Sequence, residues 1–172
     1  MPLVLTMMLG VVLAALSSAM AIGATTETMI AGAHRDGTAL FYAADAAAEF
    51  AMDELARADW PDILDTGGRS MFIDGNAPRS GTPDGPPGYA VYAYGPFGDM
   101  LNRTSRAIDP YVIVWIADLT ESSLAAASGR IAGIQATAFG QAGGRRSVAL
   151  TVRLTSSEAG VVVERLSWTE AP

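Results

Sequence analysis

Hydrophobic and polar positions divide this chain into regions with different periodicities. Every residue from Met1 to Thr26 is apolar or small, and the first charged side chain is Glu27. Helix-forming, Ala-rich sequence then continues as far as Pro61. A helix of about 55 residues would be about 80 Å long, whereas the core of a bilayer is only ~30 Å thick. We therefore expect one long helix whose first half, 1–26, spans a membrane and whose second half, 27–60, is amphipathic.

The second half of this helix carries one apolar face. From Ile30 onward, small and apolar residues recur at helical spacing, and the charged residues fall largely on the other side. The charged positions are Asp36, Asp45, Glu49, Asp53 and Arg57. The neighbouring acids Asp53 and Glu54 point to different sides of a helix, which suits solvation. The positions that we expect to pack against a sheet are Leu40, Phe41, Ala44 and Leu55.

The sequence after Pro61 predicts a loop followed by a sheet. Residues 61–88 contain too many Gly and Pro for a helix or a strand ladder. From 89 to 172, short runs with strand character are joined by turns, with Gly143-Gly144 as a hairpin turn. The expected strands are 89–94, 111–117, 131–139, 145–154 and 161–168. Strands joined in this way form an antiparallel meander, so we predict an α+β fold with the helix packed on one face of the sheet.

The first third of the chain also contains a series of short motifs. They are Thr25-Thr26-Glu27, Ile30-Ala31-Gly32, Arg35-Asp36 and an Ala-rich run from Ala39 to Ala47 that contains Ala43-Ala44-Asp45-Ala46. In this order, after an apolar segment, they resemble the N-terminal region of PilX-type minor type IV pilins. Thr28, Met29 and Ala33 depart from the Glu, Arg and Asn that are usual in that family.

The resemblance implies a type IV pilin-like fold and the function of a minor pilin or pilus assembly protein. Such a subunit is not an enzyme; it enters or primes a filament through its N-terminal helix, in support of adhesion or motility. Implied partners are other pilin or pseudopilin subunits, inner-membrane lipid before assembly, and a prepilin peptidase. The implied locations are the inner membrane, crossed once with the C-terminal domain outside the cytoplasm, and a surface filament. The residues expected to pack in assembly are Gly10, Ala14, Ala15, Ser18, Gly23, Glu27, Gly32, Arg35 and Asp36.

The first residues of the chain leave its processing open. A prepilin begins with a short basic leader that ends in Gly, and its mature helix often has a Glu near the start. Met1-Pro2-Leu3 has neither feature. We expect either that the reading frame begins upstream of Met1 or that a leader has been removed.

Other interpretations of the same pattern stay open. A type II secretion minor pseudopilin would have the same long helix and sheet. An exported binding domain would have a cleaved signal peptide; Ala19-Met20-Ala21 offers a small-x-small cleavage site, but no basic residue precedes the apolar run. A membrane-anchored enzyme is a further alternative, which the absence of any catalytic motif in the sequence disfavours.

Composition and motifs argue against catalysis, metal binding and nucleic-acid binding. The formal net charge is −7 and the basic residues are scattered, whereas phosphate binding needs clustered Lys and Arg. There is no cysteine, hence no thiol nucleophile and no thiolate zinc site. No nucleophile motif accompanies the single histidine, His34, and Asp74-Gly75-Asn76 lacks the acidic ligands of a calcium loop. We expect no enzyme activity, no cofactor and no metal, with Trp60, Trp115 and Trp168 as core or interface anchors.

Overall fold

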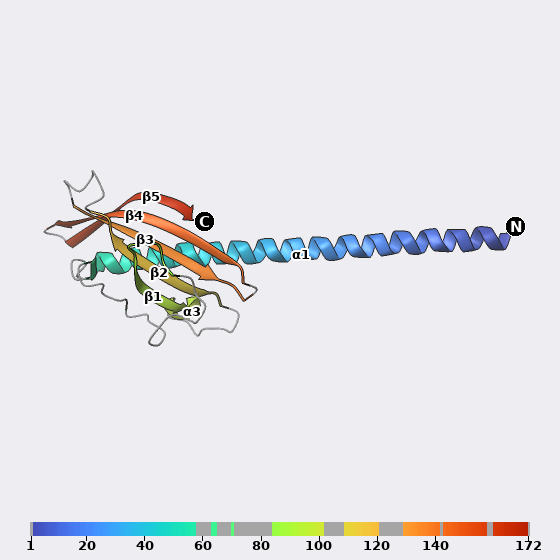
Figure 1. Cartoon of the computed structure of the whole chain (residues 1–172), viewed down its shortest axis with the longest axis horizontal. Coiled ribbons are helices and arrows are strands. Elements are labelled where there is room, and N and C mark those ends of the chain that lie inside the picture. The colour runs from blue at the N-terminus through green and yellow to red at the C-terminus, as the bar shows by residue number, and fades with distance from the viewer. Residues whose placement is uncertain are drawn as a thin grey trace. The chain divides into compact units, whose positions relative to one another are not determined.

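The structure is a computed structural model of the whole chain. It describes residues 2–57, 63–64, 70, 84–101, 109–120, 129–141, 143–157 and 160–171. Two compact units make up the chain, Met1–Asp36 and Gly37–Pro172. The first unit consists of the N-terminal part of helix α1, and the second contains the rest of α1 and a five-stranded sheet (Figure 1).

Helix α1 spans Pro2–Arg57. A proline at the first helical position is tolerated because the first N–H groups of a helix have no partner within it. No other proline interrupts the helix, and alanine, the residue with the highest helix propensity, recurs throughout it. The predicted helix therefore exists; Trp60 and Pro61, at its predicted end, lie outside the described residues.

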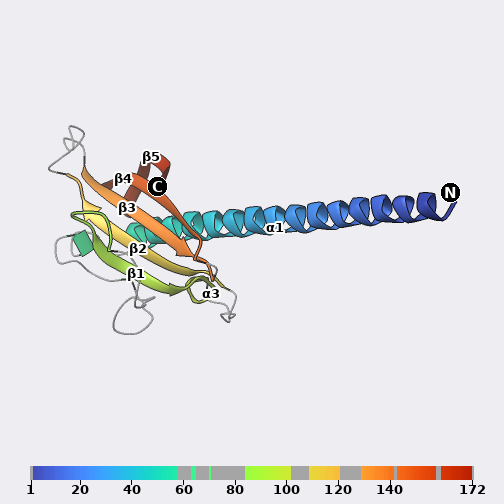
Figure 2. The same cartoon turned by 45° about the vertical axis from the view of Figure 1, so that its right-hand side comes forward.

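Five strands follow in one sheet. They are β1 (Ala90–Pro96), β2 (Tyr111–Asp118), β3 (Arg130–Phe139), β4 (Arg145–Ser157) and β5 (Gly160–Ala171). Each strand pairs antiparallel with the next one along the chain, so the spatial order equals the chain order (Figure 2). Gly143, in the turn between β3 and β4, has a φ of +79°, which glycine adopts without steric cost. The predicted antiparallel meander is confirmed, whereas the short helix α3 (Phe97–Met100) was not predicted.

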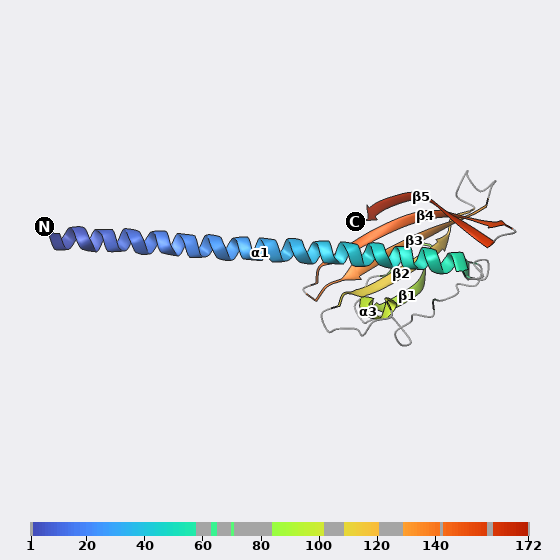
Figure 3. The same ribbon diagram turned by 180° about the vertical axis from the view of Figure 1, so that it is seen from behind.

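The C-terminal part of α1 lies across one face of this sheet (Figure 3). Four of its alanines are completely buried against the strands: Ala44, Ala47, Ala48 and Ala51. Their small side chains let the helix backbone approach the sheet closely. Alternate aliphatic residues of the strands pack against these alanines, among them Val148, Leu150, Val152 and Leu154 of β4. The expected alternation along β4 is therefore observed.

A second cluster fills the opposite face of the sheet over β1 and β2. It consists of Tyr94, Tyr111, Ile113 and Trp115, with Tyr89, Val91 and Phe139 packed against it. The chain segment 84–89 lies here, since a Cβ added at Gly85 would overlap the indole ring of Trp115. Most of the predicted loop 61–88 lies outside the described residues; its last part, 84–88, runs over this cluster. Strand β2 is covered on both faces, which explains why its sequence is nearly continuously apolar.

These observations confirm the coarse prediction of an α+β fold. An apolar N-terminal helix continues into a segment that packs on a five-stranded antiparallel sheet.

Candidate assembly surface

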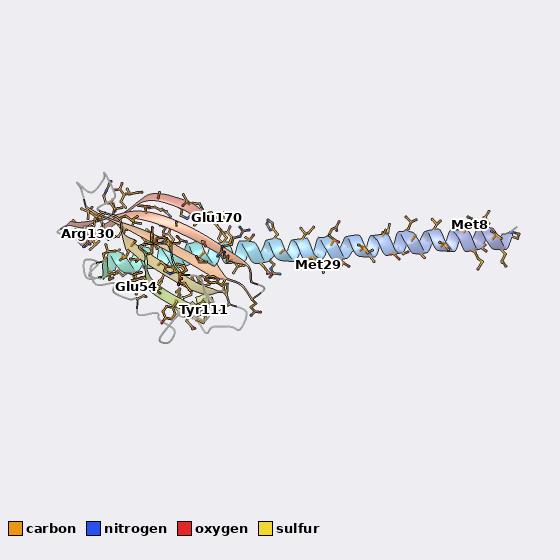
Figure 4. The ribbon with its side chains drawn as sticks, in the orientation of Figure 1. Met8, Met29, Glu54, Tyr111, Arg130 and Glu170 are labelled. Atoms are coloured by element: carbon orange, nitrogen blue, oxygen red, sulfur yellow. The ribbon has the colours of Figure 1, made fainter. Side chains whose placement is uncertain are left out.

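The N-terminal part of α1, residues 2–36, carries apolar side chains that nothing in its own unit covers. The large hydrophobic residues from Leu3 to Ile30 are between 53% and 74% exposed. Figure 4 shows two of them, Met8 and Met29, projecting from the helix ribbon. The segment is long and apolar enough to cross a membrane, and none of its most apolar stretch is buried. Fully burying one such side chain is worth about 1.5–3 kcal/mol, so this surface has a strong tendency to leave water.

The hydroxyl groups on the same segment are satisfied within the helix. Each of the six donates a hydrogen bond to a backbone carbonyl three or four residues earlier, at 2.7–2.9 Å. The donors are Thr6, Ser17, Ser18, Thr25, Thr26 and Thr28. An unpaired polar group is costly in an apolar medium. The serines and threonines therefore do not oppose transfer of this helix into lipid or into a bundle of helices.

Small residues are arranged as a stripe along one side of this segment. Steps of four and three residues, the spacing of a helix–helix seam, connect Gly10, Ala14, Ser17, Ala21, Ala24, Thr28 and Ala31. We call these seven residues the small-residue stripe. All of them are exposed. Gly10, Ala14 and Ser17 are small positions at which the sequence predicts close helix packing, whereas Ala21, Ala24, Thr28 and Ala31 are found only by following the 3–4 spacing along the helix.

The other residues expected to act in assembly lie elsewhere on this helix. Ala15, Ser18 and Gly23 fall on other sides of the helix, off the small-residue stripe, and are exposed. The remaining four, Glu27, Gly32, Arg35 and Asp36, are exposed as well. All nine predicted residues therefore lie on the first unit, and the structure does not gather them into one site.

The second part of α1 is fixed to the sheet by its apolar side chains. Leu40, Ala44 and Leu55 are buried in the core between helix and sheet, and Phe41 packs at its edge. The Phe41 ring also meets the ring of Trp168 on β5 edge to face, with the centroids 5.9 Å apart.

Acidic residues of α1 reinforce this attachment. The Glu54 carboxylate accepts hydrogen bonds from the hydroxyl of Tyr92 at 2.9 Å and from that of Ser70 at 2.7 Å. Burial raises the pKa of Tyr92, and the charge of Glu54 and its hydrogen bond raise it further. The prediction that Glu54 is simply solvated is therefore wrong: a residue that follows the exposed Asp53 by one position faces the sheet.

Two more acids of α1 contact β5. The indole N–H of Trp168 donates to the Asp45 carboxylate at 2.8 Å, and Arg165 forms an ion pair with Glu49. The prediction that charged residues lie away from the sheet is wrong for these two positions. Asp53 does fall on the outer side, where it pairs with Arg57 one turn later. The 3.6-residue periodicity of α1 identifies its apolar face. It does not show that the sheet extends past this face to the charged residues beside it.

One further charge cluster lies at the end of the β2–β3 pair. Burial works against the charged form of Asp118, but hydrogen bonds from Thr120 and Arg130 outweigh it and lower the pKa of that carboxyl. Arg130 forms an ion pair with Asp118 as well, and the Thr120 hydroxyl accepts from the N–H of Ile131 at 3.1 Å. These hydrogen bonds and this ion pair connect the adjacent ends of β2 and β3, so the cluster stabilises the sheet.

The described residues include no cluster of metal-ligating side chains, since no three His, Cys, Asp or Glu side chains among them come together. His34 lies exposed on α1, and Asp74-Gly75-Asn76 lies outside the described residues. Trp115 is buried in the second cluster and Trp168 stands at the helix–sheet edge, 41% exposed.

Comparison with known proteins adds no relative to this picture. No family model, no curated protein and no solved structure matches the chain. The functional argument therefore rests on the helix and the sheet themselves.

Proposed function

We propose that this chain is a minor pilin or pilus assembly protein, a non-enzymatic subunit that enters or primes a type IV pilus-like filament through its N-terminal helix. Before assembly, residues 3–24 hold the subunit in the inner membrane. In the filament, the same surface packs against the corresponding helices of neighbouring subunits. The layout of a long apolar helix on an antiparallel sheet, together with the motifs between Thr25 and Ala47, supports this proposal.

The observation that carries the proposal is that one continuous helix has a buried apolar face in one part and exposed apolar side chains in the other. From Leu40 to Leu55, one face of α1 is covered by the protein's own sheet. From Leu3 to Ile30 its apolar side chains are exposed. A helix that only anchored a domain would not need to continue without a break into that domain's core. A filament subunit needs this continuity, because one uninterrupted helix then belongs both to the core of the filament and to the folded domain.

The composition of the exposed part suits both membrane and filament. No charged residue precedes Glu27, so moving the segment out of lipid involves no buried ion. Helices associate in apolar surroundings mainly by close packing of small residues and by satisfied hydrogen bonds. The small-residue stripe and the internally bonded hydroxyls provide both of these features.

The mature N-terminus, read by mass spectrometry on the protein from its native host, tests the proposal. We expect an N-methylated first residue at or just upstream of Met1, with the apolar segment retained. A mature chain that begins after Ala21 would make the protein an exported domain with a cleaved signal peptide, and the filament proposal would be lost.

A further inference from the structure

A cavity of about 200 Å³ lies on the face of the sheet opposite α1. Its floor is formed by side chains of β2, β3 and β4, and the segment 84–86 forms one wall. The residues that matter for its chemistry are Asp84, Trp115, Gln135, Thr137, Arg145 and Ser147. A cavity of ~150 Å³ is known to hold benzene, so this one has room for a single six-membered ring.

The floor of the cavity is polar although it is buried. Among the described residues, three Ser or Thr side chains are buried, and two of them, Thr137 and Ser147, lie here side by side. Their hydroxyl oxygens are 2.9 Å apart and share one hydrogen bond. Two hydroxyls have two hydrogens between them, so one hydrogen and several lone pairs remain available. Each hydroxyl already has the other as a partner, and the remaining hydrogen and lone pairs can bond a polar occupant.

Three longer side chains reach the same cavity from different segments. Asp84 carries a carboxylate that only accepts hydrogen bonds, and Arg145 carries a guanidinium that only donates them. Gln135, which pairs with Trp115 across β2 and β3, can do both. Within the described part of the chain, no other side chain bonds to any of these three groups.

We propose that this cavity binds one sugar ring, a neutral polyhydroxylated ligand. Sugar hydroxyls donate and accept at once, so they can meet a carboxylate, a guanidinium, an amide and the Thr137–Ser147 pair together. The ring of Pro86 supplies apolar surface for the C–H face of the sugar, and the Trp115 indole, which is 3% exposed, lies in the cavity wall. A simple anion is disfavoured by Asp84, and a simple cation is disfavoured by Arg145.

The test is a titration of the full-length protein in a detergent that has no sugar headgroup. The probes are D-glucose, D-galactose, D-mannose and N-acetyl-D-glucosamine, with glycine and inorganic phosphate as other ligand classes. Binding is followed in nuclear magnetic resonance spectra by the indole N–H signals of the three tryptophans. We expect one indole signal to move with at least one sugar, with a Kd of about 1 mM, as a ligand of this size in a shallow site allows.

Two neighbouring arginines make a matched pair of variants. Arg145 lines the cavity, whereas Arg146 points to the other face and bonds Glu170 at 3.2 Å. Arg145→Ala and Gln135→Ala should weaken binding about tenfold, as loss of ~1.4 kcal/mol would do, while Arg146→Ala should leave the Kd unchanged. Unchanged amide spectra elsewhere in each variant check that the fold is kept.

Three results would overturn the proposal. They are no shift with any of the four sugars up to about 100 mM, far above the expected Kd, an equal response in all three variants, or a shift with glycine or phosphate alone. Because binding is measured on the isolated subunit, these outcomes are independent of whether the protein enters a filament.

Discussion

The two parts of helix α1 use similar residues for opposite purposes. Both are rich in alanine and in large apolar side chains, and both are continuous helix. From Leu40 to Leu55 most of the alanines are buried against a sheet that the chain itself supplies. From Leu3 to Ile30 the same types of residue are exposed. The second unit completes its own core, whereas the apolar side chains of the exposed part are uncovered, and we propose that lipid or other subunits cover them.

The buried part is expected to be the most sensitive to a charge. Ala48 is completely buried between helix and sheet, so Ala48→Asp places an unpaired carboxylate in the core. We expect destabilisation by more than about 4 kcal/mol, which a small domain rarely survives. Circular dichroism of the purified full-length protein should show loss of strand signal. A variant that kept native stability would mean that the helix does not pack on the sheet as described.

The same substitution in the exposed part should separate folding from assembly. Ala14 lies on the small-residue stripe, and Ala14→Asp should cost about 2.5–3.5 kcal/mol when the helix is in lipid, while the sheet keeps its stability. We therefore expect the fraction of subunits found in filaments or membranes to fall about 100-fold. Ala39→Asp, at an exposed position beside the sheet, is the matched control and should assemble normally. Normal incorporation of Ala14→Asp would contradict the filament proposal.

A smaller effect distinguishes the two neighbouring acids near the end of α1. Glu54→Ala removes the acceptor for Tyr92 and Ser70, and leaving such hydroxyls without a partner costs about 1–3 kcal/mol. Asp53→Ala removes only an exposed pair with Arg57, worth about 0.3–0.5 kcal/mol. Urea unfolding of the two variants measures the difference. Equal losses would mean that Glu54 does not hold the helix to the sheet.

The smallest expected effect is a dependence of stability on pH. The folded state raises the pKa of Tyr92 above the ordinary value of 10.0, so the folded protein holds this proton more tightly than the unfolded chain. Stability from this group is therefore complete below about pH 10 and decreases as pH rises further. Urea midpoints measured from about pH 8 to about pH 11 should fall at the alkaline end. Tyr92→Phe should make the fall shallower; an unchanged slope would assign the effect to other groups.

Much of the fold could be predicted because its signals are local. Helix α1 follows from residues such as the Ala43–Ala48 run, and β4 follows from the alternation of Val148, Leu150, Val152 and Leu154. The antiparallel meander follows from short connections such as the Gly143-Gly144 turn. These features depend on neighbours in the sequence.

What could not be predicted depends on contacts between distant residues. Asp45 and Glu49 look like solvent-facing acids in the helix pattern, yet Trp168 and Arg165 lie more than a hundred positions later and bond to them. No periodicity in α1 reveals the width of the sheet that covers it. The cluster around Trp115 likewise needs the segment at Gly85 to cover it, and nothing local in β2 specifies that segment.

The most direct test of the central claim is a measurement of how accessible the exposed part of α1 is in the assembled protein. The chain has no cysteine, so single thiols can be introduced as Ala14→Cys and, at an exposed site of α3, as Asp99→Cys. Intact cells and purified filaments are treated with a membrane-impermeant maleimide, before and after solubilisation with detergent. We expect Asp99→Cys to react in both states and Ala14→Cys to react only after solubilisation. If Ala14→Cys reacts as fast as Asp99→Cys in intact samples, or is missing from the mature protein, the account is contradicted.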